Sequence, residues 1–391
     1  MLYKDFKGLS LSKLGLGMMR LPKLEGQGES IDEKKAEAMV ERAINAGINY
    51  FDTAFRYHGG ESEAFCGKVL SRYPRDQYFI ASKMPGHMMD YKDGKFSFTG
   101  MLKDRTAMTP EQVFESQLER CKVDYFDFYL LHNLCETAYP FYSNPEIGIV
   151  DLLLKQKQAG RIKHLGFSAH GRAETIDKYL TEHPGCFEFG QIQLNYLDWT
   201  LQDAKRKYEV LEKHGLPVVV MEPVRGGKLA DLGADMNAKL KAARPDESVA
   251  AWAFRYLQGL PNVAVVLSGM STMAQLNENI DTFSSERPLN KSELALLDEA
   301  IKRLIDAVPC TGCRYCVEDC PMKLDIPTLI GMYNEMRFAP ISYTISVTLG
   351  AMQQQEMPAA CIGCKACERA CPQHIDVADV MTKFAGLLEK R

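Results

Sequence analysis

The chain has 391 residues, of which 46% are hydrophobic and 25% charged, with a formal net charge of −4. Its length allows more than one domain, and its composition is that of an ordinary globular protein. The mild acidity gives no electrostatic basis for binding nucleic acid or an acidic membrane surface. No apolar run approaches the roughly 18 residues of a membrane span. Residues 1–6 include charges and no apolar signal segment, so we expect a cytoplasmic protein.

Apolar stretches of β-type composition alternate with helical patterns along about the first 285 residues. A hairpin is predicted over 3–12. Eight pairs of a strand and a helix follow, with strands over 14–17, 48–52, 77–83, 126–131, 164–168, 187–194, 217–221 and 263–267 and helices over 33–46, 61–70, 110–121, 147–159, 173–181, 201–214, 247–258 and 272–283. The strands are continuous apolar runs, which is typical of parallel strands covered on both faces. Eight such units predict a (β/α)8 TIM barrel.

An open doubly wound sheet is the alternative fold. It is disfavoured because no G-x-G-x-x-G follows the first strand, where Gly15-Leu16-Gly17 lacks the third glycine. A charged amphipathic helix over 292–305 leads out of the barrel, and 326–336 and 341–352 form a further helix and an apolar stretch. We expect these two to pack the tail against the barrel or a partner subunit. The predicted division is a barrel over 1–288, a linker helix over 289–308 and a small α-helical, ferredoxin-like domain over 309–391.

Eight of the twelve cysteines lie in two runs, 310–321 and 361–372, with the spacing C-x2-C-x2-C-x3-C-P. This spacing is found in bacterial ferredoxins with two [4Fe–4S] clusters, in which the last cysteine of each run ligates the other cluster. Structural zinc, the alternative, usually shows two C-x2-C pairs separated by a long gap. The predicted ligand sets are Cys310, Cys313, Cys316 and Cys371 for one cluster, and Cys361, Cys364, Cys367 and Cys320 for the other. The tail resembles the two-cluster ferredoxins, with a longer separation of 40 residues between the runs.

The remaining cysteines are scattered and predict no disulfide framework. Cluster thiolates need a reducing compartment, which agrees with the cytoplasm and favours an organism or niche low in oxygen.

Polar residues follow consecutive strands of the predicted barrel. Asp52 ends the second strand and is followed by Tyr57, Lys83 ends the third, and His132 comes directly after the fourth. The active sites of such barrels lie where the strands end and the βα loops begin. Each residue alone has an ordinary structural explanation, but four residues of complementary acid–base type at one end of a barrel indicate an active site.

Six segments of the chain resemble the aldo-keto reductases, and the resemblance covers roughly residues 9–285. They are Phe51-Asp52-Thr53-Ala54-Phe55-Arg56-Tyr57, Ala81-Ser82-Lys83, Leu131-His132-Asn133, Gly166-Phe167-Ser168, Gln191-Ile192-Gln193-Leu194-Asn195 and Gln275-Leu276-Asn277-Glu278-Asn279. The resemblance implies a barrel that transfers hydride between NAD(P)H and a small carbonyl or alcohol substrate without a metal. It implies that Tyr57 is the general acid, that Lys83 lowers the pKa of Tyr57, that Asp52 keeps Lys83 charged, and that His132 bonds the substrate oxygen.

The same resemblance implies the cofactor-binding residues. They are Ser168, Gln191 and Met221 at the nicotinamide, Gly17 and Met18 through their backbone, Gly226, Gly227 and Lys228 over the pyrophosphate, and Ser268, Gly269, Met270, Gln275, Glu278 and Asn279 at the adenosine end. The chain departs from the family at Ala169, where Asn is usual, and at Met221, where an aromatic residue often stacks. Residues 267–275 contain no Lys or Arg, which NADPH-preferring members use to pair with the 2′-phosphate, so we expect NADH.

The long connection over 85–110 is rich in methionine and is expected either to shape the substrate pocket or to pack under the tail. His58, His87 and His170 match no metal-ligand motif and are expected to form hydrogen bonds.

Hydride transfer moves two electrons, whereas a [4Fe–4S] cluster moves one. Three functions therefore remain open: a carbonyl reductase with structural or regulatory clusters, an enzyme that couples the barrel to one-electron chemistry through a flavin or a substrate radical, and an electron-transfer module with the barrel as scaffold. A redox protein is a candidate partner in the last two. No convincing flavin motif is present, although such barrels can bind FMN at the phosphate site after strands 7 and 8. The intact set of four polar residues argues against the third function.

Overall fold

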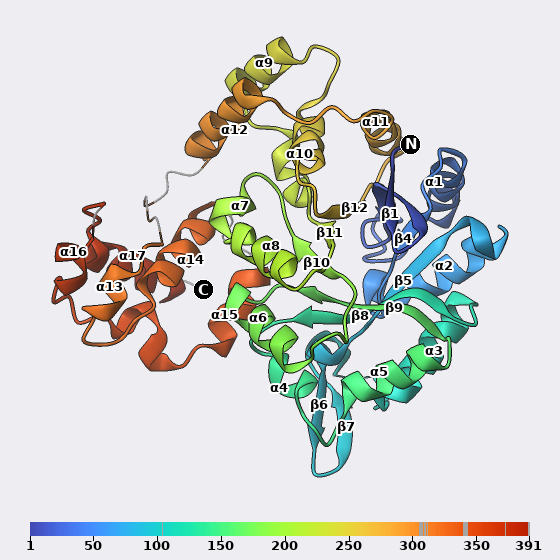
Figure 1. Ribbon diagram of the computed structural model, residues 1–391, viewed down its shortest axis with the longest axis horizontal. Coiled ribbons are helices and arrows are strands. Elements are labelled where there is room, and N and C mark those ends of the chain that lie inside the picture. The colour runs from blue at the N-terminus through green and yellow to red at the C-terminus, as the bar shows by residue number, and fades with distance from the viewer. Residues whose placement is uncertain are drawn as a thin grey trace.

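The computed structural model describes residues 1–103, 105–304, 308, 310, 312–338, 343–371 and 373–389. Eight parallel strands close a barrel in the order β10-β11-β12-β3-β4-β5-β8-β9 (Figure 1). The predicted (β/α)8 barrel is thereby confirmed. Its strands are β3 (Leu14–Gly17), β4 (Tyr50–Asp52), β5 (Phe79–Met84), β8 (Phe126–Leu134), β9 (Ile162–Ala169), β10 (Gly190–Gln193), β11 (Val218–Met221) and β12 (Val263–Ser268).

The predicted helices connect these strands on the outside of the barrel. They are α1 (Glu33–Asn45), α2 (Ser62–Leu70), α3 (Pro110–Cys121), α5 (Ile149–Gln158), α6 (Ala173–Glu182), α8 (Ala204–Lys213), α10 (Val249–Gln258) and α11 (Met273–Thr282). The helix predicted over 201–214 is divided into a short α7 (Asp198–Leu201) and α8. The division falls at Asp203, whose φ of 53° lies in the left-handed region and cannot continue a helix.

A hairpin of β1 (Tyr3–Phe6) and β2 (Leu9–Ser12) closes the N-terminal end of the barrel. Phe6 is buried and packs on Phe128 and Phe189, with ring centroids 5.3 and 6.2 Å apart. Side chains thus fill this end, and the C-terminal end, where the βα loops begin, is left for ligands.

The methionine-rich connection forms a second hairpin, β6 (Met89–Lys92) and β7 (Lys95–Phe98), which projects from the barrel in Figure 1. Its buried side chains, Met88, Met89 and Phe98, belong to the main core, and the Phe98 ring stacks on Phe55 at 5.8 Å. Met88 and Met89 therefore pack the hairpin onto the barrel. Two further short helices, α4 (Tyr139–Tyr142) and α9 (Ala234–Ala243), were not predicted.

The cysteine-rich domain follows α12 (Lys291–Leu304) and repeats one backbone plan 51 residues apart. The short α13 (Tyr315–Glu318) corresponds to α16 (Ala366–Arg369), and the longer α14 (Ile326–Phe338) corresponds to α17 (Val377–Glu389). Gly312 and Gly363 occupy equivalent positions with φ of 70° and 69°, a conformation that favours glycine. The two cysteine runs therefore share one conformation as well as one spacing.

The cysteine-rich domain has its own hydrophobic core and contacts the barrel through α14 and α15 (Tyr343–Ala351). In Figure 1 these two helices lie on the barrel side of the domain. Glu335 of α14 accepts hydrogen bonds from Arg225, and from Gln202 at 3.1 Å. Asn133 donates to the Tyr343 hydroxyl at 2.9 Å, and Val347 packs against the barrel core. The tail is thus seated on the barrel, near the ends of its strands.

Among the helices described, every one is too short or too polar to span a lipid bilayer.

Glu335 is 2% exposed and faces the buried Arg225, so we expect Glu335→Ala to destabilise the junction between the domains. Loss of hydrogen bonds to a buried charged group should lower the free energy of unfolding by about 1–3 kcal/mol. Chemical denaturation of the cluster-loaded protein measures this change. The control is Glu174→Ala, which removes an exposed pair with Arg206 and should cost less than about 1 kcal/mol. Equal effects of the two substitutions would contradict a stabilising role for Glu335.

Candidate active site and cysteine cavities

Lys83 forms hydrogen bonds with two of the other three predicted catalytic residues, Asp52 and Tyr57. It lies in β5 with 0% exposure, and its ammonium donates to Asp52 Oδ1 at 2.5 Å and to the Thr53 carbonyl at 2.9 Å. A third bond, at 3.4 Å, reaches the Tyr57 hydroxyl. His132 completes the group, with its ring 6.0 Å from that of Tyr57. The structure therefore brings together all four residues from the ends of three neighbouring strands and the loop after β4.

The pKa of Tyr57 is set by two opposing effects. Burial of the phenol raises its pKa, and the nearby Lys83 ammonium lowers it by a smaller amount, so that the pKa is raised from its ordinary value. Lys83 thus acts in the expected direction, and the desolvation of a phenolate outweighs this one adjacent charge. The pKa of Lys83 is raised, since Asp52 and Tyr57 more than offset the effect of its burial. Tyr57 therefore holds its proton at neutral pH, beside a charged lysine.

Two histidines lie next to this group. The rings of His87 and His132 are 4.5 Å apart, and burial lowers the pKa of both, to about 4 for His87. Both imidazoles are neutral at physiological pH. Within the described part of the chain, the Nδ1 atoms of both are buried without a hydrogen-bond partner. Buried polar atoms of this kind are usually paired, so these nitrogens are suited to a ligand.

The residues predicted to bind nicotinamide also present unpaired atoms. Gln191 Oε1 is buried and has no partner among the described residues, while its Nε2 lies 3.9 Å from Met221 Sδ. Ser168 Oγ accepts the backbone N–H of Asn133 at 2.9 Å. A carboxamide offers the donors that such acceptors lack, so this pocket fits a nicotinamide.

Asn133 is a candidate that the sequence analysis missed. It is 2% exposed, and its Oδ1 has no partner among the described residues. Its side chain lies one strand away from Ala169, the position where the family usually has Asn. The available signal was its place directly after His132, but its left-handed φ of 61° could not be read from the sequence.

Other predicted cofactor residues are already engaged within the protein. The Met18 N–H donates to the Asp52 carbonyl at 2.8 Å, and the Met18 carbonyl accepts from Ser62. Met18 thus connects the end of β3 to Asp52 of β4 and to Ser62 of α2. A Cβ atom at Gly17 would lie 3.4 Å from the Ser268 carbonyl oxygen, so the backbone of β3 lies close to the loop after β12. Gly226 and Gly227 are exposed with positive φ, and Lys228 beside them is exposed.

At the predicted adenosine end, the side chains form hydrogen bonds with neighbouring residues of the protein. Gln275 caps α11 through Thr272, Glu278 accepts from Ser248 at 2.5 Å, and Asn279 donates to Ser268 at 3.1 Å. Met270 is buried, and Gly269 packs under the Arg20 side chain. These contacts order the loop after β12.

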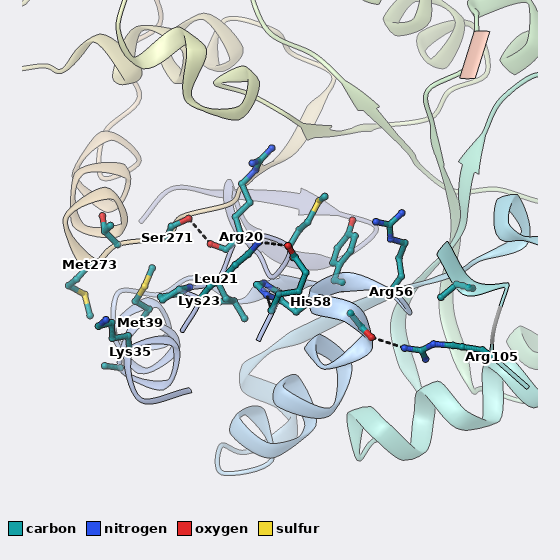
Figure 2. A pocket seen from close by; sticks show the side chains of 18 residues that line it. Arg20, Leu21, Lys23, Lys35, Met39, Arg56, His58, Arg105, Ser271 and Met273 are labelled. Atoms are coloured by element: carbon teal, nitrogen blue, oxygen red, sulfur yellow. Dashed lines mark hydrogen bonds and ion pairs between the residues drawn. The ribbon is translucent and has the colours of Figure 1, made fainter. Parts of the chain in front are cut away.

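A cavity of about 1030 Å³ extends from Tyr57 to residues 271–273 (Figure 2). This volume is large enough for a sizeable ligand. Its lining includes five cationic side chains: Arg20, Lys23, Lys35, Arg56 and Arg105. Sequence analysis missed them as a group because they come from segments far apart in the chain. The adenosine end of the groove therefore has cations nearby, although the loop after β12 carries none.

Three of these cations are neutralised by carboxylates. Ion pairs join Arg20 to Glu222 at 2.8 Å, Lys23 to Glu29 at 2.6 Å and Lys35 to Asp32 at 2.9 Å. Arg105 donates to the Gly59 carbonyl at 2.6 Å. Arg56 differs from these four and is considered separately below.

The two predicted cluster ligand sets line two separate cavities. Cys310, Cys313 and Cys316 of the first run share one cavity with Cys371 of the second. The other cavity is lined by Cys320, Cys361, Cys364 and Cys367. Each cavity thus receives three thiols from one run and one from the other, as the sequence analysis expected.

Each cavity is lined by four thiols, which is the donor set of a [4Fe–4S] cluster. In the described part of the chain, no three His, Cys, Asp or Glu side chains converge closely enough to hold a single metal ion. Burial, together with the neighbouring cysteines, raises the pKa of Cys316 to about 11. Burial and nearby acidic groups do the same for Cys367. A cationic group is therefore needed to hold these sulfurs as thiolates.

Comparisons with known proteins agree with this geometry. Residues 13–302 match the model of the aldo/keto reductase family, and residues 309–375 match a 4Fe-4S dicluster domain. The chain belongs to the aldo/keto reductase family. It is an NAD(P)-dependent oxidoreductase with an iron–sulfur domain, and the substrates of this class are small carbonyl compounds.

Among the relatives is an uncharacterized oxidoreductase of Bacillus subtilis, 27% identical over 75% of this chain and 94% of its own length. An NADH-specific methylglyoxal reductase of Escherichia coli is 27% identical over 56% of this chain and 66% of its own. An aldo-keto reductase structure from Bacillus halodurans shares the fold with a TM-score of 0.59 at 24% identity, over 77% of this chain and 96% of its own. A Klebsiella pneumoniae aldo-keto reductase in complex with NADPH also has a TM-score of 0.59, at 21% identity, over 76% of this chain and 95% of its own.

Proposed function

We propose that this protein reduces a carbonyl substrate with NAD(P)H and that Tyr57 delivers the proton. The observation that carries the proposal is the buried Lys83, which bonds both Asp52 and Tyr57. Keeping a lysine charged at 0% exposure costs folding free energy. Buried charges of this kind are typical of active sites, where they act on a reacting group.

Bound NAD(P)H supplies a hydride, with its electron pair, to the carbonyl carbon. As the carbon–oxygen π bond breaks, Tyr57 gives its hydroxyl proton to the oxygen, and Lys83 stabilises the phenolate that remains. His132 is neutral and lies at ring-contact distance from Tyr57, so it orients the same oxygen by hydrogen bonding. Solvent then returns a proton to Tyr57, which balances the reduction.

The cysteine cavities support two [4Fe–4S] clusters, each with three ligands from one run and one from the other. We retain residues 1–288 as the barrel, 289–308 as the linker and 309–391 as the cluster domain. Ile326, the first residue of α14, lines both cavities, and Glu335 of the same helix bonds the barrel. This continuity supports a structural or regulatory role for the clusters in the reductase, ahead of the electron-transfer alternatives.

We expect Tyr57→Phe to lower kcat for NAD(P)H-dependent carbonyl reduction by roughly 100- to 10,000-fold, because the general acid is lost. Binding of the cofactor should be retained, since the aromatic ring stays in place. Steady-state kinetics and cofactor titration measure the two effects. Tyr3→Phe, which removes an exposed hydroxyl that bonds Gly47, is the control. Turnover of Tyr57→Phe near the wild-type rate would contradict the assignment.

Cofactor preference follows from the charges near the adenosine end. Three cations there are already paired with carboxylates, and the loop after β12 has none. We therefore expect tighter binding of NADH than of NADPH, in agreement with the NADH-specific relative from Escherichia coli. Fluorescence titration of the two cofactors gives their dissociation constants. A lower dissociation constant for NADPH would reverse the preference.

We expect Cys313→Ala to reduce the iron content of anaerobically purified protein by about half, from about eight atoms per chain. The Cys364→Ala substitution should have the same effect, because it removes one ligand of the other cavity. Cys186→Ala, which changes a cysteine outside both cavities, should leave the iron content unchanged. Unchanged iron in both cavity variants would exclude the proposed ligands.

A further inference from the structure

Arg56 is a cation at the active site that the proposed reaction does not use. It directly precedes Tyr57 in the chain, is half-buried and lines the same cavity. No described residue forms a hydrogen bond or an ion pair with its guanidinium. In Figure 2 its side chain points away from Arg105, and no dashed line reaches it. Arginine in a half-buried site is usually paired, so this guanidinium is available to a ligand.

The charge of Arg56 acts on groups around the catalytic centre. It contributes to the lowered pKa of His87 and His132, and it partly offsets the rise in the pKa of Tyr343. The guanidinium therefore lies within electrostatic reach of both histidines and of the first residue of α15. These three neighbours are neutral at physiological pH. The charge of Arg56 also helps to lower the pKa of Glu29, but that carboxylate forms its ion pair with Lys23, at 2.6 Å.

We propose that Arg56 binds the carboxylate of the substrate, so that the enzyme acts on carbonyl compounds that carry a carboxylate near the reacting carbon. This inference rests on the proposed reductase function and specifies its substrate class. A planar guanidinium accepts a carboxylate through two parallel hydrogen bonds, which fixes the substrate in position and in orientation. Since Arg56 is the residue before Tyr57, the carboxylate would be held close to the proton donor.

A single free guanidinium suits a carboxylate better than a phosphate. A phosphate monoester carries a charge of about −1.5 to −2 at neutral pH, which one guanidinium does not neutralise. The other cations of this cavity are occupied by Glu222, Glu29, Asp32 and the Gly59 carbonyl. Arg56 is therefore the one cation of this cavity for which no described residue accepts a hydrogen bond or forms an ion pair, and its guanidinium matches one carboxylate. A neutral carbonyl compound would leave Arg56 without a partner.

The test compares 4-oxobutanoate with its methyl ester, in the cluster-loaded protein and in Arg56→Met, Arg56→Lys and Lys35→Met. We expect Arg56→Met to lower kcat/KM for the acid about 10- to 100-fold, as for the loss of charge-assisted hydrogen bonds. The ester should change less than about 3-fold. Arg56→Lys should restore part of the loss, since it keeps the positive charge but not the two parallel hydrogen bonds of a guanidinium. Lys35→Met removes a cation of the same cavity that is paired with Asp32, and it should not separate the two substrates.

Calorimetric binding of the product, 4-hydroxybutanoate, gives a readout that does not depend on turnover. Weaker binding to Arg56→Met, with an unchanged dissociation constant for NADH, supports the carboxylate site. An equal loss of activity on acid and ester, or a loss of NADH binding in Arg56→Met, would overturn it. If the wild-type protein reduces neither substrate, the proposed function fails. The product titration then tests the role of Arg56 by itself. That role is supported if the wild-type protein binds 4-hydroxybutanoate and Arg56→Met does not. It is overturned if both proteins bind the product equally well, or if the wild-type protein shows no binding.

Discussion

The site depends on one buried ion pair, Lys83 with Asp52 at 2.5 Å inside the barrel. A charged ammonium with 0% exposure would cost several kcal/mol if it were unpaired, so the carboxylate must lie where it does. Asp52 ends β4 and Lys83 lies in the adjacent β5, and the pairing of these strands sets their distance. The same ammonium also reaches the Thr53 carbonyl and the Tyr57 hydroxyl. The pairing of β4 with β5 thus closes the barrel and also sets the positions of Asp52 and Lys83 beside Tyr57.

The cluster domain extends this organisation beyond the barrel. Its α14 carries Glu335 to Arg225, the residue before the two glycines predicted to cover the pyrophosphate. Its α15 brings Tyr343 to Asn133, directly after His132. Both helices belong to a domain whose core includes cysteines of the two runs. The packing around these cysteines and the rim of the candidate active site are therefore joined by the same two helices.

The sequence predicted what depends on local pattern and missed what depends on distant contacts. Strand periodicity indicated the barrel, and cysteine spacing indicated which thiols share a cavity. The hairpin over β6 and β7 was missed because its apolar residues are interrupted by charges and contact the barrel from outside. Arg20 and Glu222 are 202 residues apart, so no local sequence pattern could predict their ion pair. The effect of Lys83 on the pKa of Tyr57 followed from the sequence, but the larger effect of burial did not, because desolvation is a property of the folded site.

The two cysteine cavities share the helices that enclose them. Ile326 of α14 and Val377 of α17 line both cavities. Ile330 of α14 lines the cavity of Cys310, and Met381 at the equivalent position of α17 lines the cavity of Cys361. The helix α14 also bonds the barrel through Glu335. Both cavities are therefore built on the helix that contacts the barrel, so a change at either one acts on the same junction between the domains.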